Sequence, residues 1–431
     1  MIIKGYIKQA WNLMKQNKLF TGIYVAGTGL AIAMTMTVFI VLYVKFAPIY
    51  PEYNRDRTLV LKYISRTNKD KSPGKSASNL PYKMVDMLCD LPHLDKIGAL
   101  WKQGQGYSVT IPQTQAERNI NCTFTDKGYW EVFTYRFLGG RPFTDAEVTS
   151  SRKVVILTES MAKTLIGNTD AVGKYVRING NEYQVCGVVE DVSAVTPVTN
   201  ADLFLPLHFW PRSKFSMGLL GSLELYMTAT SASDKEALRA EIQDVINRYN
   251  QEDMKYEWNL MEQPDDYWKS TFRTSMHEAP NMKELTKGLL YILFALLFIP
   301  ALNLSGMISS RMNRRVSEFG IRKSYGATNV QIIGQVLSEN LVLSLIGGIV
   351  GILFSYIIVL FANEWIMYIF TKVHYINPFI ASPVFTFEML FNSTLFVLVL
   401  GLCIVLNLIS ALIPTLWALR RPIVECLYTK R

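Results

Sequence analysis

The densest group of chemically capable side chains lies in the segment Arg311–Thr328, which contains four arginines, one lysine and one glutamate. In a helix, Glu318 lies three residues from Arg315 and four from Arg322. Those are the two spacings at which side chains of opposite charge pair. We therefore expect Glu318 to pair with both arginines along one face of a helix.

The same segment carries signals for two helix boundaries. Gly326 suits the left-handed residue that ends a helix. Thr328 followed by Gln331 is typical of the capping box that begins the next helix. An ordinary basic loop would explain the arginines but not these boundaries. We predict a short ordered helix with Val316 and Phe319 on one apolar face.

Elsewhere in the sequence, residues of types that could bind phosphate or metal, or act in catalysis, form no recognised site. Gly74-Lys75-Ser76 is the closest match to a phosphate-binding loop, but Lys69 stands where that loop needs its first glycine. The four histidines, at 93, 208, 277 and 374, have no metal-binding spacing. Asp265-Asp266 is interpreted as a solvated turn. We therefore expect no enzyme active site, no metal and no cofactor bound by this chain.

Four stretches of the chain lack Asp, Glu, Lys and Arg: 19–44, 288–310, 340–363 and 389–419. Each exceeds the roughly 20 helical residues that cross a bilayer, so we predict four membrane helices. The first is too long for the apolar region of a signal peptide, about 7–15 residues, and is predicted to be an uncleaved anchor.

Composition agrees with a membrane protein, because 50% of the 431 residues are hydrophobic and only 18% are charged. Residues 1–18, 309–330 and 419–431 carry 13 of the 44 basic residues and two of the 35 acidic ones. By the positive-inside rule this face is cytoplasmic. We predict a multi-pass protein of the inner (plasma) membrane with both termini in the cytoplasm. The net charge of +9 then gives no indication of nucleic-acid binding.

The fold class predicted is an α-helical membrane protein of four transmembrane helices, with a large α+β extracytoplasmic domain inserted between helices 1 and 2. The predicted segments are a cytoplasmic amphipathic helix (1–18), the first membrane helix (19–45), the extracytoplasmic domain (46–283), the second membrane helix (284–310), a cytoplasmic coupling loop (311–330), the third membrane helix (331–363), an external aromatic loop (364–388), the fourth membrane helix (389–419) and a cytoplasmic tail (420–431). Contact of the amphipathic helix and the aromatic loop with membrane lipid is expected. In the third helix, Glu339 should lie at the interface and face protein.

Within the external domain, hydrophobic periodicity predicts both strands and helices. The predicted strands are Thr58–Ile64, Arg118–Thr125, Lys153–Thr158, Tyr175–Ile178, Tyr183–Val189, Asp202–Leu207 and Leu223–Ala229, and the predicted helices lie near Pro81–Cys89, Glu159–Ile166 and Asp234–Tyr249. Thr67–Ser78 is the most linker-like stretch. For Cys89, Cys122 and Cys186 the sequence leaves two alternatives: one disulfide between two of them, or unpaired buried thiols.

The segment Arg315–Thr328 resembles the R-x-x-E-x-G-I-R-K-A-x-G-A signature of MacB/FtsX-type ABC transporter permeases. It departs from the signature at Ser324-Tyr325, where Ala-Leu is usual, and we expect this to tune a partner interface. Gly139–Phe143, Ala171–Lys174 and Tyr183–Val189 resemble the MacB-type periplasmic core domain. The resemblance covers the whole chain.

This resemblance implies a permease subunit that transmits closure of a separate cytoplasmic ATPase to the external domain, in order to export a periplasmic substrate. ATP and Mg would be bound by that partner, because this sequence contains no Walker A motif. A second permease copy, in a homo- or heterodimer, is implied; a periplasmic adaptor and an outer-membrane channel are further candidate partners. The alternatives are an FtsX-like signal relay that activates an external partner, and a lipoprotein-releasing permease. The much shorter external domain of FtsX-like chains favours the MacB-type interpretation.

The residues expected to couple the chain to the ATPase share the signature segment. They are Arg315, Glu318, Phe319, Gly320, Ile321, Arg322, Lys323, Gly326 and Ala327. Among them Glu318, Arg322 and Lys323 are the expected polar contacts, and Phe319 and Ile321 the packing contacts. Pro300 and Pro414 can bend their helices, because proline removes a backbone donor.

Overall fold

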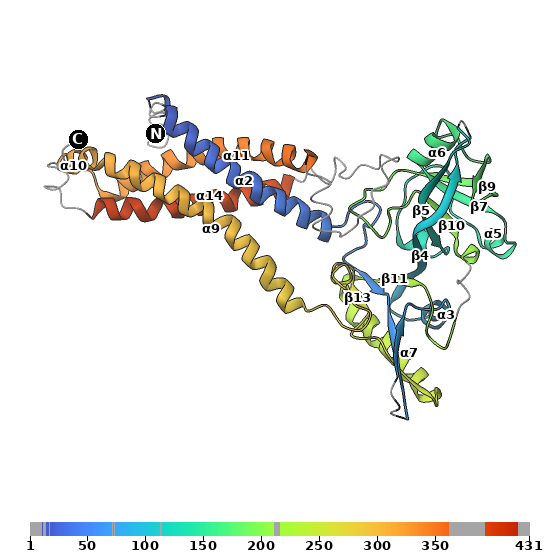
Figure 1. Ribbon diagram of the computed structural model, residues 1–431. Coiled ribbons are helices and arrows are strands. Elements are labelled where there is room, and N and C mark those ends of the chain that lie inside the picture. Colours follow the sequence, from blue (N-terminus) through green and yellow to red (C-terminus); the bar gives the residue numbers. More distant parts are fainter. Residues whose placement is uncertain are drawn as a thin grey trace. The chain divides into compact units, whose positions relative to one another are not determined.

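The computed structural model describes residues 11, 14–16, 18–70, 72, 74–112, 114–210, 216–361 and 393–420. They form two compact units, and Figure 1 labels many of their helices and strands. The described residues up to Tyr43 and from Met282 onward make up the helical unit, and Val44–Asn281 make up the sheet unit. The aromatic loop 364–388, and all of 1–18 and 420–431 except 11, 14–16, 18 and 420, lie outside the described residues.

The sheet unit is built on a mixed 10-stranded sheet among the described residues. Its main path runs β13-β1-β11-β4-β5-β10-β7-β9-β6, and β8 pairs with β4 and β9. The pairs β5–β10 and β7–β9 are parallel. The strands are β1 (Thr58–Leu61), β4 (Leu94–Thr110), β5 (Glu117–Thr125), β6 (Phe137–Gly140), β7 (Val154–Thr158), β8 (Tyr175–Ile178), β9 (Asn181–Val189), β10 (Leu203–Pro206), β11 (Glu224–Ala229) and β13 (Asp265–Asp266).

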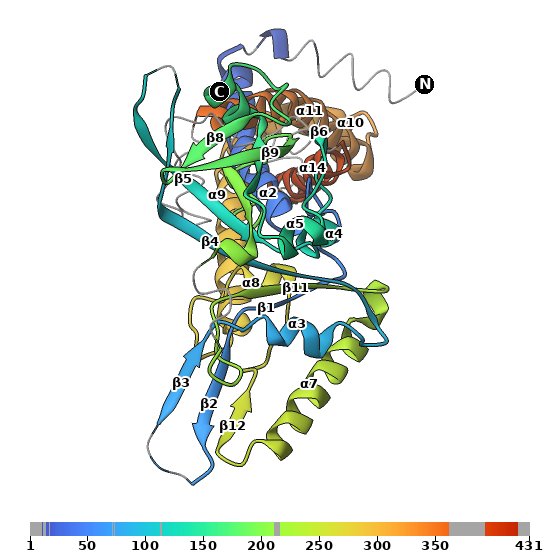
Figure 2. The same cartoon turned by 90° about the vertical axis from the view of Figure 1, so that its right-hand side faces the viewer.

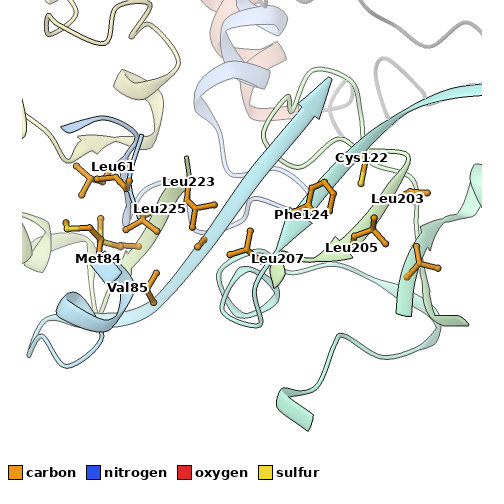
Figure 3. Packing of buried hydrophobic residues seen from close by; sticks show 14 of the residues in the cluster. Leu61, Met84, Val85, Cys122, Phe124, Leu203, Leu205, Leu207, Leu223 and Leu225 are labelled. Atoms are coloured by element: carbon orange, nitrogen blue, oxygen red, sulfur yellow. The ribbon is translucent and has the colours of Figure 1, made fainter. Parts of the chain in front are cut away.

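Both faces of this sheet are covered along β1, β7 and β10, and this explains why every residue of these three strands is buried. In β7, Val155 and Leu157 face one core cluster, while Val154 and Ile156 face a second cluster. The period-2 alternation of side chains along a strand requires this division. Figure 3 shows the first cluster, in which β10 and β11 contribute leucines that lie beside Phe124 and Met84.

A second, smaller sheet has the order β12-β2-β3, formed by Tyr256–Asn259, Ile64–Asn68 and Lys75–Ser78. Figure 2 shows this sheet beside helix α7 (Lys235–Glu252), which contributes Leu238 and Ile242 to the first core cluster. The remaining helices of the unit are short. They are α3 (Lys83–Leu88), α4 (Tyr129–Val132), α5 (Asp145–Thr149), α6 (Glu159–Ile166), α8 (Tyr267–Ser270) and the 3₁₀ turns η1 (Leu207–Phe209) and η2 (Ala232–Asp234).

The structure corrects three sequence predictions in this unit. The run Thr58–Ile64 is not one strand: it divides into β1 and β2 of different sheets, because the Gln263 side-chain oxygen accepts the backbone N–H groups of Lys62 and Tyr63. The interpretation of Thr67–Ser78 as a linker was wrong, because its last four residues form strand β3, which pairs with β2. Strand β4 was missed, because glycines and polar residues interrupt its apolar pattern.

The glycine-rich motif Gly139–Phe143 begins in strand β6, where Gly139 and Gly140 pair with β9. Gly140 has φ +74°, and a Cβ there would lie 2.1 Å from the carbonyl oxygen of Cys186, so only glycine fits. Arg141 then donates from both Nη atoms to Glu147, at 2.9 and 3.0 Å. These hydrogen bonds lower the pKa of Glu147 to about 2. The motif is therefore explained by local geometry.

The helical unit contains α2 (Lys18–Phe46, which extends into the sheet unit), α9 (Met282–Arg314), α10 (Val316–Ser324), α11 (Asn329–Phe361) and α14 (Ser393–Leu419). Among the described residues, α2, α11 and α14 are long and apolar enough to cross a membrane. Pro414 lies inside α14. The side chain of Pro300 in α9 is outside the description. The bends at both prolines stay predictions.

Helices α2 and α11 approach each other closely through glycines. A Cβ at Gly351 would lie 2.6 Å from the carbonyl oxygen of Gly29 and 2.9 Å from Cβ of Ile32. Small residues allow such backbone approach between membrane helices. We expect Gly351→Val to lower the thermal unfolding midpoint of the full chain in detergent by several degrees, because overpacking costs about 1–3 kcal/mol.

The matched control for this prediction is Gly334→Ala in the same helix. A Cβ at Gly334 meets nothing within 4 Å, and alanine has the higher helix propensity. That midpoint should stay the same or rise. Equal midpoints for the two variants would contradict a close α2–α11 contact.

Candidate functional site at helix α10

Helix α10 is a separate element because its sequence defines both ends. Arg315, at φ −103° and ψ 6°, breaks the helical path after α9. Gly326, at φ +92°, provides the left-handed stop. Thr328 and Gln331 exchange reciprocal hydrogen bonds of 2.9 and 3.3 Å, and these confirm the predicted capping box at the start of α11.

An apolar face fixes α10 to the rest of the helical unit. Val316 and Phe319 are 1% and 2% exposed. Phe319 lies in one buried cluster with Met312 of α9, Ile332 of α11 and Ala418 of α14. Figure 1 shows α10 at one end of the helices that supply this cluster. Burying a phenylalanine contributes about 1.5–3 kcal/mol, so this anchor holds the helix in place.

A buried carboxylate connects the same helices by charge. Glu339 of α11 is 1% exposed and accepts from Arg315 at 2.7 Å and from Arg311 at 3.1 Å. Its second oxygen accepts from Gln335 Nε2 at 3.0 Å. The prediction that Glu339 faces protein is therefore confirmed. Removing one partner of such a pair leaves an uncompensated buried charge, which costs about 3–5 kcal/mol.

Glu318 continues the network onto α10 itself. Its carboxylate pairs with Arg315 at 2.8 Å and with Arg322 at 2.8 Å. Both predicted ion pairs are thereby confirmed. Burial opposes the charged form, but the two arginines outweigh it and lower the pKa of Glu318. Because the pKa of its carboxyl is lowered, Glu318 stays ionised at neutral pH and loses its ion pairs only as the pH falls through that lowered pKa.

Two further residues complete the attachment of α10. Arg322 also donates to the side-chain oxygen of Gln335. Lys323 donates from Nζ to the carbonyl oxygen of Leu419, at 2.8 Å, at the end of α14. A cation at the last carbonyls of a helix is favourable because of the helix dipole. Helix α10 is thus tied to α9, α11 and α14 at once.

Three apolar side chains at or near α10 are exposed. Ile321 is 49% exposed, Tyr325 89% and Val330 78%. They lie on α10, at its end and in the first turn of α11. Exposed apolar side chains beside charged ones are typical of a protein interaction surface. We call these three residues the outer face of α10.

The structure thus gathers the predicted site residues but gives them different surroundings. Phe319 and Gly320 face inward and are buried, whereas Ile321 faces out. Glu318, Arg322 and Lys323 bond within the chain. Sequence reasoning assigned no role in the site to Arg311, Gln335 or Glu339; the polar stripe at i and i+4 along α11 was the available signal.

Potential metal-ligating side chains are scattered in the part of the chain that the structure describes. No three His, Cys, Asp or Glu residues lie close enough there to bind a metal ion. Cys89, Cys122 and Cys186 are free thiols; Cys89 is exposed and Cys122 is buried. Burial raises the pKa of Cys186 to about 12, so its thiol stays protonated.

Two family models match this chain. Residues 21–245 match the MacB-like periplasmic core domain. Residues 290–423 match the FtsX-like permease C-terminal domain, which includes α10 and the buried Glu339. The chain belongs to the MacB/FtsX-type family of ABC transporter permeases, and it is a membrane protein with a large α/β domain.

The chain is similar to the uncharacterized ABC transporter permease YknZ of Bacillus subtilis, with 28% identity over 56% of this chain and 58% of that one. It is 27% identical to the macrolide export protein MacB of Aggregatibacter actinomycetemcomitans, over 59% of this chain and 39% of that one. It therefore spans about half the length of these relatives. The solved extracellular domain of YknZ aligns with 46% of this chain and 99% of its own, at 18% identity and a TM-score of 0.34.

Proposed function

We propose that this chain is the permease subunit of an ABC exporter whose ATPase is a separate cytoplasmic protein. Helix α10 docks on that ATPase through its outer face. Closure of the ATPase on ATP then moves α10, and the helices fixed to it transmit this movement to the sheet unit. ATP and Mg are bound by the ATPase, and the permease itself catalyses no reaction.

The observation that carries this proposal is the construction of α10. A short helix is fixed to three other helices by a buried phenylalanine and by ion pairs, and yet presents exposed Ile321 and Tyr325 on its other side. Such an element is rigidly joined to its own chain and free to bind a partner. A loop needed only for topology would require neither feature.

Four membrane helices are part of the proposal, with α9 as the second. Residues 288–310 carry no charged side chain and lie within α9. The excess of Lys and Arg near α10 supports, by the positive-inside rule, a cytoplasmic position for this helix and an external one for the sheet unit. A second permease copy completes the assembly. Relatives named for macrolide export and pyoverdine export support an exported cargo.

The test is co-purification of the tagged chain from native membranes in mild detergent, followed by measurement of ATP hydrolysis. We expect an ABC ATPase to accompany the chain and to hydrolyse ATP in the complex. Purification without any ATPase would contradict the proposal. An ATPase together with a bound external hydrolase would instead indicate a signal relay.

A further inference from the structure

The two connections between the sheet unit and the membrane helices each contain a buried arginine. Arg55 follows the end of α2, and Arg273 precedes the start of α9. Their side chains are 5% and 0% exposed. Arginine is rarely buried unless paired, so two such residues at the two connections require an explanation.

At the incoming connection, Arg55 holds the end of α2. Its Nε donates to Glu52 Oε2 at 2.7 Å, and its Nη1 donates to the carbonyl oxygens of Val44 at 2.7 Å and Ala47 at 2.8 Å. The other oxygen of Glu52 accepts from Thr199 Oγ1 at 2.7 Å. The last turn of α2 is therefore bonded through Arg55 and Glu52 to the interior of the sheet unit.

At the outgoing connection, Arg273 makes the equivalent contacts. Its Nε pairs with Asp265 Oδ2 at 2.6 Å, and its Nη groups donate to the carbonyl oxygens of Glu278 at 2.9 Å and Met261 at 3.2 Å. Asp265 belongs to β13, which pairs with Val60 of β1. The interpretation of Asp265 as a solvated turn was thus wrong: it is 1% exposed.

The two connections also contact each other through α8. The Arg55 guanidinium lies 5.1 Å from the ring centre of Tyr267. Phe46, the last residue of α2, packs against Trp268 and Phe272, with ring centres 5.8 and 6.3 Å apart. Aromatic side chains from both connections therefore pack together between the two arginines.

A buried ion pair adds little net stability, because desolvation opposes the attraction. The planar guanidinium instead fixes geometry, since it directs several donors at once. We propose that Arg55 and Arg273 are positioning residues of a junction clamp, which joins both chain connections to the sheet so that movement of the membrane helices reaches the sheet unit undiminished. This inference rests on the proposed transmission function.

The test is the double variant Arg55→Lys, Arg273→Lys, in the full chain with its ATPase. Lysine keeps the positive charge beside each carboxylate but loses the planar set of donors. We expect amide hydrogen exchange around residues 44–52 and 273–279 to become about tenfold faster or more, because charged hydrogen bonds are lost. We also expect the change in sheet-unit exchange on trapping with Mg-ATP to disappear.

The control is Arg57→Lys, two residues from Arg55. Arg57 pairs with Asp95 near the surface, where the two side chains are 26% and 33% exposed. This variant should respond to trapping as the unchanged chain does. A double variant that transmits normally would overturn the clamp. If the chain bound no ATPase, the proposed function would fail. Faster exchange at the two connections of the double variant, measured without ATPase, would still support the clamp, so the two proposals can fail separately.

A rescue experiment excludes misfolding as the cause. In a Cys89→Ser background, Phe46→Cys and Trp268→Cys are added to the double variant and joined by a short bis-maleimide. The cross-link replaces the lost connection between α2 and α8. We expect it to restore the response to trapping. Failure of the cross-linked protein to respond would overturn the clamp.

Discussion

Replacing Glu339 with leucine is expected to abolish coupling between the ATPase and the permease. Arg311 and Arg315, whose side chains are 15% and 11% exposed, would then lose the carboxylate that they share; loss of one partner of a buried ion pair costs about 3–5 kcal/mol. A cost of that size lowers the fraction of molecules with a correctly attached α10 about 100-fold or more, relative to those in which it is detached. The measurement is ATP hydrolysis of the purified complex, with hydrogen exchange across 316–324 as the structural readout.

Glu339→Gln should have a smaller effect, because glutamine keeps the size and an acceptor oxygen for one arginine. The surface control is Glu284→Gln on α9. Glu284 pairs with Lys287, and the two side chains are 66% and 60% exposed; such pairs contribute about 0–1 kcal/mol. If the leucine variant hydrolysed ATP and protected α10 as the control does, Glu339 would not position this helix.

The second large effect is expected at the outer face of α10. Tyr325→Asp with Val330→Asp should weaken ATPase binding by about 100-fold or more, because each apolar side chain contributes about 1.5–3 kcal/mol when buried. Both residues are exposed, at 89% and 78%, so folding should be unaffected. The measurement is the affinity of the purified permease for its ATPase, with the thermal unfolding midpoint recorded in parallel.

The control for this variant is Met254→Asp, which introduces the same charge at an apolar side chain 89% exposed in the sheet unit. ATPase affinity should stay unchanged. A Tyr325→Asp, Val330→Asp protein that bound the ATPase as tightly as the control would place the docking surface elsewhere on the chain.

Much of this account could be predicted from the sequence, because its signals are local. The ion pairs of Glu318 follow from spacing along one helix, and Gly326 and Thr328 mark helix ends by their own chemistry. Helix α6 begins and ends as predicted, at Glu159 and Ile166. In each case residues no more than four positions apart determine the structure.

The remaining features depend on residues far apart in the sequence. Arg315 and Glu339 are separated by 24 positions, and no periodic pattern connects them. The pair Asp265-Asp266 is of a residue type common in turns, but Arg273 and strand β1 bury Asp265. Phe319 was expected to contact the ATPase, yet its side chain fills the core between α9, α11 and α14. Tertiary packing decided these positions, and local propensity did not.

Contact between the outer face of α10 and an ABC ATPase can be tested in the intact membrane. The most direct measurement is photo-crosslinking in native membranes, with a photoreactive amino acid at Tyr325, which is exposed, and separately at Phe319, which is buried. We predict a covalent adduct with an ABC ATPase from position 325 and none from position 319. Adducts from position 325 that contain only lipid, or another protein, would contradict the account.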